Sequence, residues 1–487
     1  MTKTTLNKTI YAYVPISMGD LNQLLSGTGL SPDRARLLFH NLHLSALRQA
    51  SSDDKRGRWL LQQGWVSIDS KILKRILTSN YVKYLDWAEA QGFIERRRNE
   101  ETGRAKYTAG KYCQVIKIAS DLLHKDGTLR HFRKEAITEK KALAAISRLR
   151  QYYKERREAS GWYHLVNPTH IRIVAMTQTL KFRMDDAEKF LTKKYNYAKT
   201  TIRKNLLQYY LHIIEAIDNN TLDYFTVDRF GNRLHTPITG LYSPLRSYIY
   251  FESMPDEPIS YVDIGSSQVY LLSSILARPD LVTKLLPEFA ACIPALEKYS
   301  HSPDVLDFHS KCCEGIIYEH FAGAYNKQKP IGAEQQRKMR DKVKKRLISF
   351  LYSNPKNAKS SAQNSRRLSE FKDFFLQHYP NVYRGINELK AMGVKEFPFM
   401  EDFYKAKNKK YGDHAGYINP SRVGQLLESL IILGLISPEL IQRGILFTTV
   451  HDAFITPKCY AEKIKETINE KFCGLGLTPP KIKITEL

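Results

Sequence analysis

The sequence has few cysteines and no long apolar run. Six cysteines occur among 487 residues without a CxxC pair, so neither a zinc site nor a disulfide framework is predicted, and free thiols are expected. No run of about 18 uncharged apolar residues is present, so we expect no membrane-spanning helix. The N-terminal segment lacks the apolar core and cleavage site of a signal peptide, which favours a cytoplasmic protein.

Acidic residues are also scarce relative to basic ones. The chain has 75 Lys and Arg against 50 Asp and Glu, a formal net charge of +25, while its 43% hydrophobic content excludes global disorder. A basic excess favours either polyanion binding or simple solubility. Because 29 Tyr and 21 Phe are interleaved with the basic residues, nucleic acid is the favoured partner, since phosphates attract cations and bases stack on aromatic rings.

A motif near the N-terminus combines two helices and a basic hairpin. Residues Ser67–Leu77 carry apolar side chains at helical spacing after a Ser or Asp cap, and a second helix ends on Gly92. Phe93–Arg98, a polar turn and a following alternating segment predict a β-hairpin. This order resembles a winged helix, in which one helix enters a DNA groove and the wing contacts phosphate.

The winged-helix resemblance implies a set of nucleic-acid contacts. They would be made by the basic side chains of the hairpin, namely Arg96, Arg97, Arg98, Arg104 and Lys106. The alternatives are a winged helix that binds protein, or a solvated arginine-rich hairpin.

The rest of the N-terminal half favours helices. Residues 1–60 have a helical pattern, Arg133–Glu158 can form one long helix with an apolar seam, and Asp185–Ile217 is a second helical region. These basic helices would present either a solvated face or a grip on a nucleic-acid backbone.

Two aspartates follow predicted strands in the C-terminal half. The segment Ile259–Leu276 predicts a strand that delivers Asp263, then a turn and a helix. The segment Gly444–Pro457 predicts two strands around a tight turn that contains Asp452, which is 452 − 263 = 189 residues further along. Carboxylates on rigid strands suit a divalent metal such as Mg²⁺, which prefers oxygen ligands.

A basic helix is predicted between the two aspartates. Seven of the ten residues of Arg337–Arg346 are Lys or Arg, and Arg340, Lys344, Ile348 and Tyr352 recur every four residues along one face. Such a face offers two cations to a triphosphate and an aromatic ring to a base or sugar. Taken singly, the segment also fits an amphipathic helix that packs on the core.

The order of these segments resembles motifs A, B and C of the family A DNA polymerases and of the phage-type single-subunit RNA polymerases. The resemblance covers the residues from 222 onward. Upstream, Asp228–Ile249 is similar to the segment before motif A, and Val423–Leu435 is similar to the palm helix before motif C.

The polymerase resemblance implies residue roles. Asp263 and Asp452 would hold two Mg²⁺ ions, for which Mn²⁺ can substitute, and Arg340 and Lys344 would bind the triphosphate. Primer and template would be contacted by Arg233 and His451. The incoming nucleotide would meet Ile348, Tyr352 and Gln268.

Several positions depart from the family patterns, among them Ser353, which replaces the glycine after the motif B tyrosine. Gln268 stands where the DNA enzymes carry a glutamate that excludes the ribose 2′-hydroxyl and the RNA enzymes carry glycine. Ile348 replaces an aromatic residue, and HDAF at His451–Phe454 is closer to the RNA enzymes. Bulk at position 268 favours deoxynucleotides, so the expected function is a DNA-dependent DNA polymerase without a proofreading exonuclease, from plasmid or phage replication.

Two alternatives stay open. One is a single-subunit RNA polymerase or primase, and the other is a non-catalytic DNA-binding replication initiator. The expected partners are primer–template DNA and nucleoside triphosphates, with origin DNA at the winged helix.

The expected fold class is α+β, a right-hand polymerase with palm, fingers and thumb and a largely helical N-terminal region that contains the winged helix. The expected domains are 1–120 (helical and winged-helix module), 121–221 (thumb-like) and 222–487 (palm and fingers, with fingers at about 279–411). A polar loop at Pro355–Arg367 would follow the basic helix.

Overall fold

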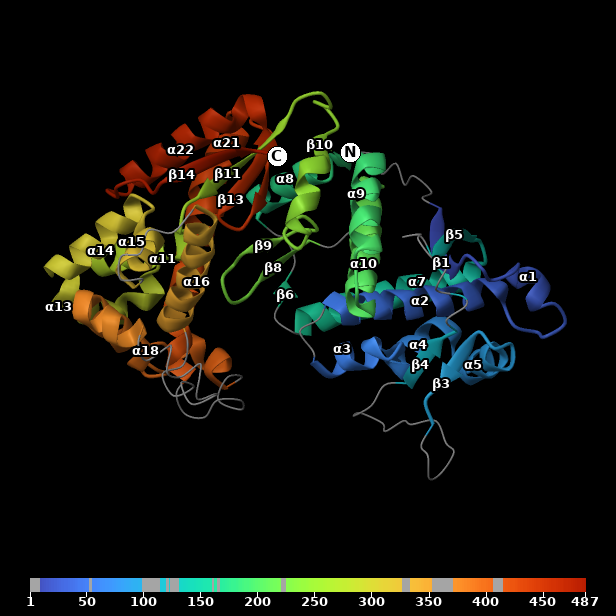
Figure 1. The fold of residues 1–487 in the computed structure, drawn as a ribbon. Coiled ribbons are helices and arrows are strands. Elements are labelled where there is room, and N and C mark those ends of the chain that lie inside the picture. The colour runs from blue at the N-terminus through green and yellow to red at the C-terminus, as the bar shows by residue number, and fades with distance from the viewer. Residues whose placement is uncertain are drawn as a thin grey trace. The chain divides into compact units, whose positions relative to one another are not determined.

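The computed structural model describes residues 9–51, 55–98, 114–119, 122, 131–159, 162–163, 167–219, 225–325, 333–352, 371–405 and 415–487. Figure 1 shows the ribbon. The chain forms two compact units. Unit 1 contains residues 1–161, 182–222 and 241–248, and unit 2 contains 162–181, 223–240 and 249–487. The chain therefore crosses between the units several times, whereas the expected domains were contiguous stretches of sequence.

Unit 1 is mainly helical, with short strands between its helices. Its elements are β1 (Ile10–Pro15), α1 (Leu21–Leu24), α2 (Pro32–Ser51), α3 (Lys55–Gln62), β2 (Trp65–Ile68), α4 (Ser70–Leu77), α5 (Tyr81–Ala90), β3 (Ile94–Arg96), β4 (Gln114–Ile118), β5 (Phe132–Ile137), α7 (Lys140–Ala159), α9 (Met184–Asn196), α10 (Thr201–Asp218) and η1 (Ser243–Tyr248).

The two predicted helices and the hairpin of the N-terminal motif are present. Asp69 caps α4 by accepting a hydrogen bond from the backbone N–H of Lys71, and α5 is followed by Gly92 at φ +71°. Strands β3 and β4 pair antiparallel, and β2 adds to the other side of β4, which gives the sheet order β2-β4-β3. Two helices therefore lie between the first two strands of a three-stranded antiparallel sheet.

Two helical predictions in unit 1 are wrong in part. Residues 10–15 form strand β1, although residues 1–60 were expected to be helical. The predicted single helix Arg133–Glu158 begins with strand β5, which pairs antiparallel with β1. Asp33 accepts hydrogen bonds from the backbone N–H groups of Thr138 and Glu139, at 2.7 Å each, and helix α7 begins at the next residue, Lys140. A partner strand more than a hundred residues away therefore overrides the local helical pattern.

Unit 2 holds a four-stranded sheet and many helices. Its elements are β6 (Trp162–Tyr163), α8 (Pro168–Thr177), β8 (Thr226–Asp228), β9 (Leu234–His235), β10 (Ile249–Phe251), β11 (Ile259–Ile264), α11 (Ser267–Ala277), α12 (Asp280–Leu285), η2 (Pro287–Cys292), α13 (Ile293–Ser300), α14 (Pro303–Cys313), α15 (Ile317–Tyr325), α16 (Ala333–Tyr352), α18 (Pro380–Ala391), η4 (Pro398–Met400), η5 (Ala415–Ile418), α20 (Asn419–Ser429), η6 (Leu430–Ile436), α21 (Ser437–Gln442), β12 (Thr448–Val450), β13 (Ala453–Pro457), η7 (Lys458–Tyr460), α22 (Ala461–Gly474) and β14 (Ile482–Glu486). Strand β7 (Leu180–Phe182) lies where the chain passes from unit 2 to unit 1.

The sheet of unit 2 carries the predicted aspartates. It is antiparallel with strand order β12-β13-β11-β14, and it places Asp263 on β11 next to the β12–β13 turn that contains Asp452. Val262 and Phe454, from the two central strands, are fully buried in the large core cluster that also includes Leu347 of α16. Figure 1 shows α22 beside this sheet and the group α13 to α16 beyond it. The core thus fixes the strands and α16 in one unit.

One stretch passes a simple test for a membrane span. Among the described residues, the helical stretch Ala415–Gln442 is 28 residues long and contains an 18-residue window with a mean hydropathy of 1.5, of which 61% is buried inside the protein. Val423, Leu426 and Ile432 belong to the core cluster of unit 2. Packing in the core accounts for the apolar character of this stretch.

Candidate active site

Asp263 lies on strand β11, and Asp452 lies in the turn that leads into the neighbouring strand β13. Asp263 is the penultimate residue of β11 and pairs with Ala453 of β13, and the backbone N–H of Ile264 donates to the carbonyl oxygen of Asp452 at 3.4 Å. His451 and Asp452 form the two-residue connection between β12 and β13, as predicted. Antiparallel pairing therefore brings together two carboxylates that are far apart in the sequence.

Backbone conformations of high energy cluster around these residues. Four described non-glycine residues have positive φ, and three of them adjoin or belong to the predicted site: Ser266 (+58°), His451 (+56°) and Asn232 (+54°), which precedes Arg233. The left-handed region is costly for residues with a Cβ, and such residues gather at functional sites. Gly265 adds a close approach, since a Cβ there would lie 2.9 Å from the carbonyl oxygen of Lys481.

Burial and a neighbouring carboxylate shift the pKa values of both carboxyl groups upward. Burial, together with the neighbouring Asp452, raises the pKa of Asp263 to about 6, although Lys344 and Lys483 act in the opposite direction. Burial, with the carboxylate of Glu428, raises the pKa of Asp452 to about 6. Two desolvated carboxylates that repel each other favour a bound cation.

The donor set fits Mg²⁺ bound in part by a substrate. Among the described residues, no group of three or more His, Cys, Asp or Glu side chains is placed to hold a metal ion. Mg²⁺ in phosphoryl-transfer sites is typically held by one or two carboxylates, with water and substrate phosphates completing its coordination. Asp263 and Asp452 supply that number of carboxylates.

The predicted basic helix is α16, and it presents Lys344 and Arg340 on one face. Both cations lie over the ring of Tyr318, with 5.9 Å from the Lys344 Nζ and 5.3 Å from the Arg340 Cζ to the ring centroid. Arg340 is held by Glu319, whose Oε1 accepts from Nε at 2.6 Å. Lys344 is exposed, and its charge acts on Asp263. Lys344 is therefore the cation of α16 that faces the carboxylates.

Tyr352 and Gln268 lie in contact. The Tyr352 hydroxyl donates to the backbone carbonyl of Gln268 at 3.0 Å, so the end of α16 is joined to the start of α11. Ile348, one turn earlier on α16, is half-buried and packs against the core. Three residues predicted to meet the nucleotide thus lie near one another.

Glu428 is a component of the site that the sequence patterns did not single out. It is 3% exposed and accepts hydrogen bonds from three side chains. Arg233 donates from Nε and Nη2 at 2.8 and 2.7 Å, and the Ser267 hydroxyl donates at 2.9 Å, with the Gln268 amide as the third donor. The available signal was that Glu428 is the one charged residue of the segment Val423–Leu435, which is mostly apolar.

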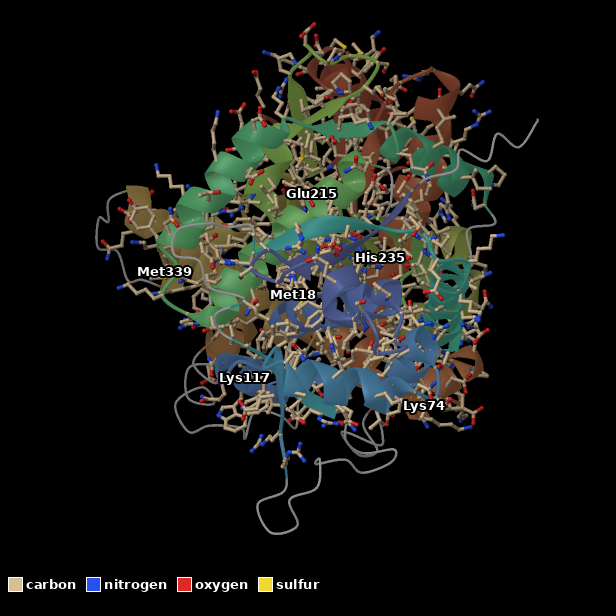
Figure 2. All side chains as sticks on the ribbon, turned by 90° about the vertical axis from the view of Figure 1, so that its right-hand side faces the viewer. Met18, Lys74, Lys117, Glu215, His235 and Met339 are labelled. Atoms are coloured by element: carbon tan, nitrogen blue, oxygen red, sulfur yellow. The ribbon has the colours of Figure 1, made fainter. Side chains whose placement is uncertain are left out.

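A second set of contacts places Arg233 and His451 near Asp263 and Asp452. The His451 ring meets that of His235 edge to face, with centroids 5.5 Å apart. His235, which is labelled in Figure 2, contacts a carboxylate oxygen of Asp228 through Nε2 at 2.9 Å. The charge of Arg233 lowers the pKa of Asp452, against the larger effect of burial. The structure therefore brings Asp263, Asp452, Lys344, Arg233 and His451 into one region of unit 2.

The predicted nucleic-acid contacts of the hairpin lie in unit 1 and are not equivalent. Arg96 is 12% exposed and forms ion pairs with Glu89 and Asp86, and Arg98 is paired with Glu89. Arg96 thus joins β3 to α5 within the protein. Arg97 is half-buried, and Arg104 and Lys106 lie outside the described residues, as does Pro355–Arg367.

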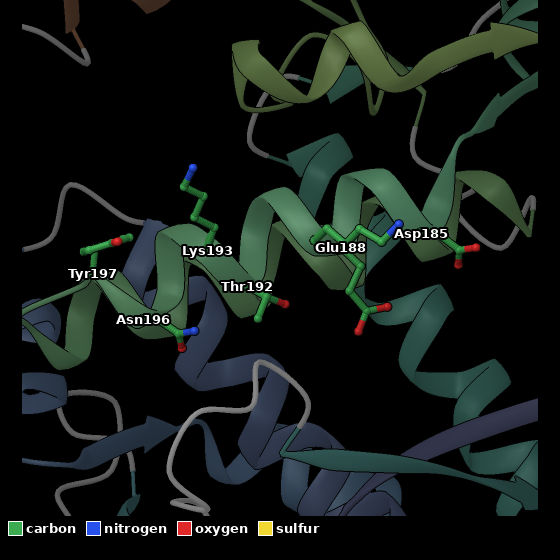
Figure 3. A pocket seen from close by; sticks show the side chains of 7 residues that line it. Asp185, Glu188, Thr192, Lys193, Asn196 and Tyr197 are labelled. Atoms are coloured by element: carbon green, nitrogen blue, oxygen red, sulfur yellow. The ribbon is translucent and has the colours of Figure 1, made fainter.

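A shallow hollow runs along one helix of unit 1. It has a volume of about 620 Å³ and is lined by α9 side chains, including Glu188 and Lys193, and by Tyr197, which follows the helix. Figure 3 shows Lys193 extending to the side opposite Thr192 and Asn196. No residue that was predicted for the site is among the described residues that line this hollow.

The likeness of this chain to known proteins is found among solved structures. No protein-family model matches the sequence, and no curated protein matches it. A solved structure, the POL domain of Pol1 from M. smegmatis in complex with DNA primer–template and dNTP, is similar over 93% of this chain and 70% of that chain, with 9% identity and a TM-score of 0.36. A likeness of that size carries no argument on function.

Proposed function

We propose that the protein is a template-directed nucleotidyltransferase, specifically a DNA polymerase that extends a primer by a two-metal mechanism. One observation carries the proposal: Asp263 on β11 lies beside Asp452 in the β12–β13 turn, where His451 has a positive φ, and both carboxyl groups have pKa values raised to about 6. Replication of a plasmid or phage, without proofreading, is the biological setting that we propose.

Each side chain has a role in this proposal. Asp263 and Asp452 hold Mg²⁺, which when bound supplies charge for activating the primer 3′-hydroxyl and for stabilising the leaving pyrophosphate. Lys344 and Arg340 bind the triphosphate and neutralise charge that grows during transfer. Arg340 must first exchange Glu319 for phosphate. Tyr352 fixes the backbone at Gln268, which faces the sugar. Arg233 contacts the minor groove of the primer–template, and His451 contacts the primer terminus.

The proposal is tested by offering the purified protein a primed DNA template with deoxynucleotides or with ribonucleotides, and the same template without primer. Mg²⁺-dependent extension of the primer by deoxynucleotides is expected. Extension only with ribonucleotides, or only without a primer, would instead identify an RNA polymerase or primase. No incorporation under any condition, with DNA binding intact, would favour a non-catalytic initiator.

Metal binding should be visible without any activity. At pH 8, about 10 mM Mg²⁺ is expected to raise the melting temperature by about 1–2 °C, since a cation that binds only the native state stabilises it by mass action. The +25 charge of the chain disfavours non-specific Mg²⁺ binding. NaCl at equal ionic strength is the control. An equal shift in the Asp263→Asn/Asp452→Asn double variant would place the metal elsewhere.

We also propose that the helix–hairpin module β2, α4, α5, β3 and β4 binds duplex DNA as a winged helix. Its strand order and the helices between its first two strands support this. Lys74 of α4 and Lys117 of β4, both labelled in Figure 2, add to the basic side chains of the module.

Neighbouring arginines allow a matched test of that surface. Arg97→Ala is expected to weaken duplex binding about 3–10-fold and to lower the salt dependence, because a phosphate contact is lost. Arg96→Ala is expected chiefly to lower the melting temperature, because Glu89 loses its buried partner. Fluorescence anisotropy over a salt series and thermal melts would separate the two effects. If Arg97→Ala left duplex binding unchanged, its proposed phosphate contact would be wrong.

A further inference from the structure

We infer that Glu428 is the positioning residue for sugar selection: it fixes the side-chain amide of Gln268 so that this amide can discriminate between deoxyribose and ribose. The inference rests on the proposed function and names a determinant of specificity within that site. It is carried by the hydrogen bonds that converge on Glu428.

Both oxygens of the Glu428 carboxylate accept hydrogen bonds from neighbouring side chains. Its Oε1 accepts from Nε and Nη2 of Arg233, and its Oε2 accepts from Ser267 and Gln268. With both oxygens occupied, Glu428 has no oxygen left for a metal ion without breaking these bonds. A buried carboxylate is stable only when it is paired in this way. Glu428 therefore holds other residues in place.

These contacts determine which way the Gln268 amide points. A carboxylate can only accept hydrogen bonds, so it must face the amide nitrogen of Gln268, and the amide oxygen points away. That oxygen lies toward Gly424 of α20, where a Cβ would be 3.3 Å from it. Glu428 on one side and the bare backbone of Gly424 on the other thus define the rotamer and the orientation of Gln268.

The backbone of Gln268 is fixed as well. Tyr352 donates to its carbonyl oxygen at 3.0 Å, and the adjacent Ser267 donates to the same Glu428 oxygen at 2.9 Å. A side chain that screens a 2′-hydroxyl must be held rigidly, because a loose one moves aside at little cost. Glu428 supplies this rigidity through two consecutive residues of α11.

The test is a double-mutant cycle on the full chain. The ratio of kcat/KM for dNTP to that for NTP is measured on a primed template for the wild type, Glu428→Gln, Gln268→Gly and the double variant. Glu428→Gln keeps the volume but turns an acceptor into a donor opposite Gln268, so we expect about a tenfold fall in the ratio. Gln268→Gly should lower it at least as much. The double variant should match Gln268→Gly alone, because Glu428 acts through Gln268.

Two further variants distinguish a specific change in sugar selection from a general loss of protein stability. Glu215→Gln removes a buried glutamate that is 5% exposed and binds Tyr13 and Lys134 in unit 1; Glu215 is labelled in Figure 2. This control should lower the melting temperature and leave the sugar ratio unchanged. Gly424→Ala crowds the Gln268 oxygen from the other side without removing a charge, and it should also lower the ratio.

The outcomes separate the two proposals. If the wild type incorporates neither kind of nucleotide, the proposed function fails. If the wild type incorporates dNTP but Glu428→Gln and Gly424→Ala leave the ratio unchanged, this inference is wrong while the function stands. Additive effects of Glu428→Gln and Gln268→Gly would also overturn it, since Glu428 would then act independently of Gln268.

Discussion

Asp452→Asn is expected to abolish primer extension, with a fall in the single-turnover rate of about 10³-fold or more. Asparagine keeps the shape of the aspartate but removes the negative charge on which metal binding depends. Asp452 lies in a turn between two paired strands, so the sheet should keep its register. Affinity for primer–template DNA, measured by anisotropy, should change by no more than about threefold.

Stability should move in the opposite direction from activity. The pKa of Asp452 is about 6 in the folded protein against an ordinary value of 3.8. Because the folded-state pKa is the higher one, ionisation costs the native state free energy above pH 6, and this cost disappears below about pH 4. Asparagine avoids the cost, so Asp452→Asn without metal should be more stable at pH 8, on the order of 1 kcal/mol, and equally stable at pH 4.

A surface aspartate of the same unit provides the control. Asp256 is exposed and lies seven residues before Asp263 in the chain, so Asp256→Asn makes the same chemical change away from the two carboxylates. It should leave extension and stability unchanged. If Asp452→Asn retained more than about a tenth of the wild-type rate, Asp452 would not be a metal ligand of the reaction.

Local patterns predicted the elements of the site well. The strand and helix around Asp263, the turn at Asp452 and the helix of Lys344 each follow from neighbouring residues, and the structure contains all of them. The segment Arg133–Ile137, which was expected to be helical but forms strand β5, shows the limit of prediction from local patterns. Its pairing with β1 depends on residues more than a hundred positions away, which periodicity within a window cannot detect.

The partners of charged residues were the least predictable part. From sequence, Arg96 and Arg97 are two members of one basic run, yet Glu89 and Asp86 hold Arg96. Glu428 was one acid in an apolar helix, and its role depends on Arg233 and Ser267, each more than 150 positions away. Such pairings are set by tertiary packing, because a buried charge is tolerated only where the fold brings a partner to it.

Lys344→Met is expected to lower kcat/KM for dNTP by about 10²–10³-fold. Lys344 is exposed on α16 and its charge acts on Asp263, as the proposed function requires of the cation that binds the triphosphate. Methionine keeps most of the length of the side chain and can pack over Tyr318, which lies 5.9 Å from the amine. The loss should appear in both KM and kcat, because the charge on the phosphates grows during transfer.

Lys345→Met is the matched control. Lys345 is the next residue of the same helix and is also exposed, but one residue turns its side chain by about 100° around the helix axis. It is not among the cations that lower the pKa of Asp263. Lys345→Met should therefore leave the KM for dNTP within about twofold of the wild type. Equal losses in both variants would mean that α16 contributes only general positive potential, and the triphosphate contact assigned to Lys344 would be wrong.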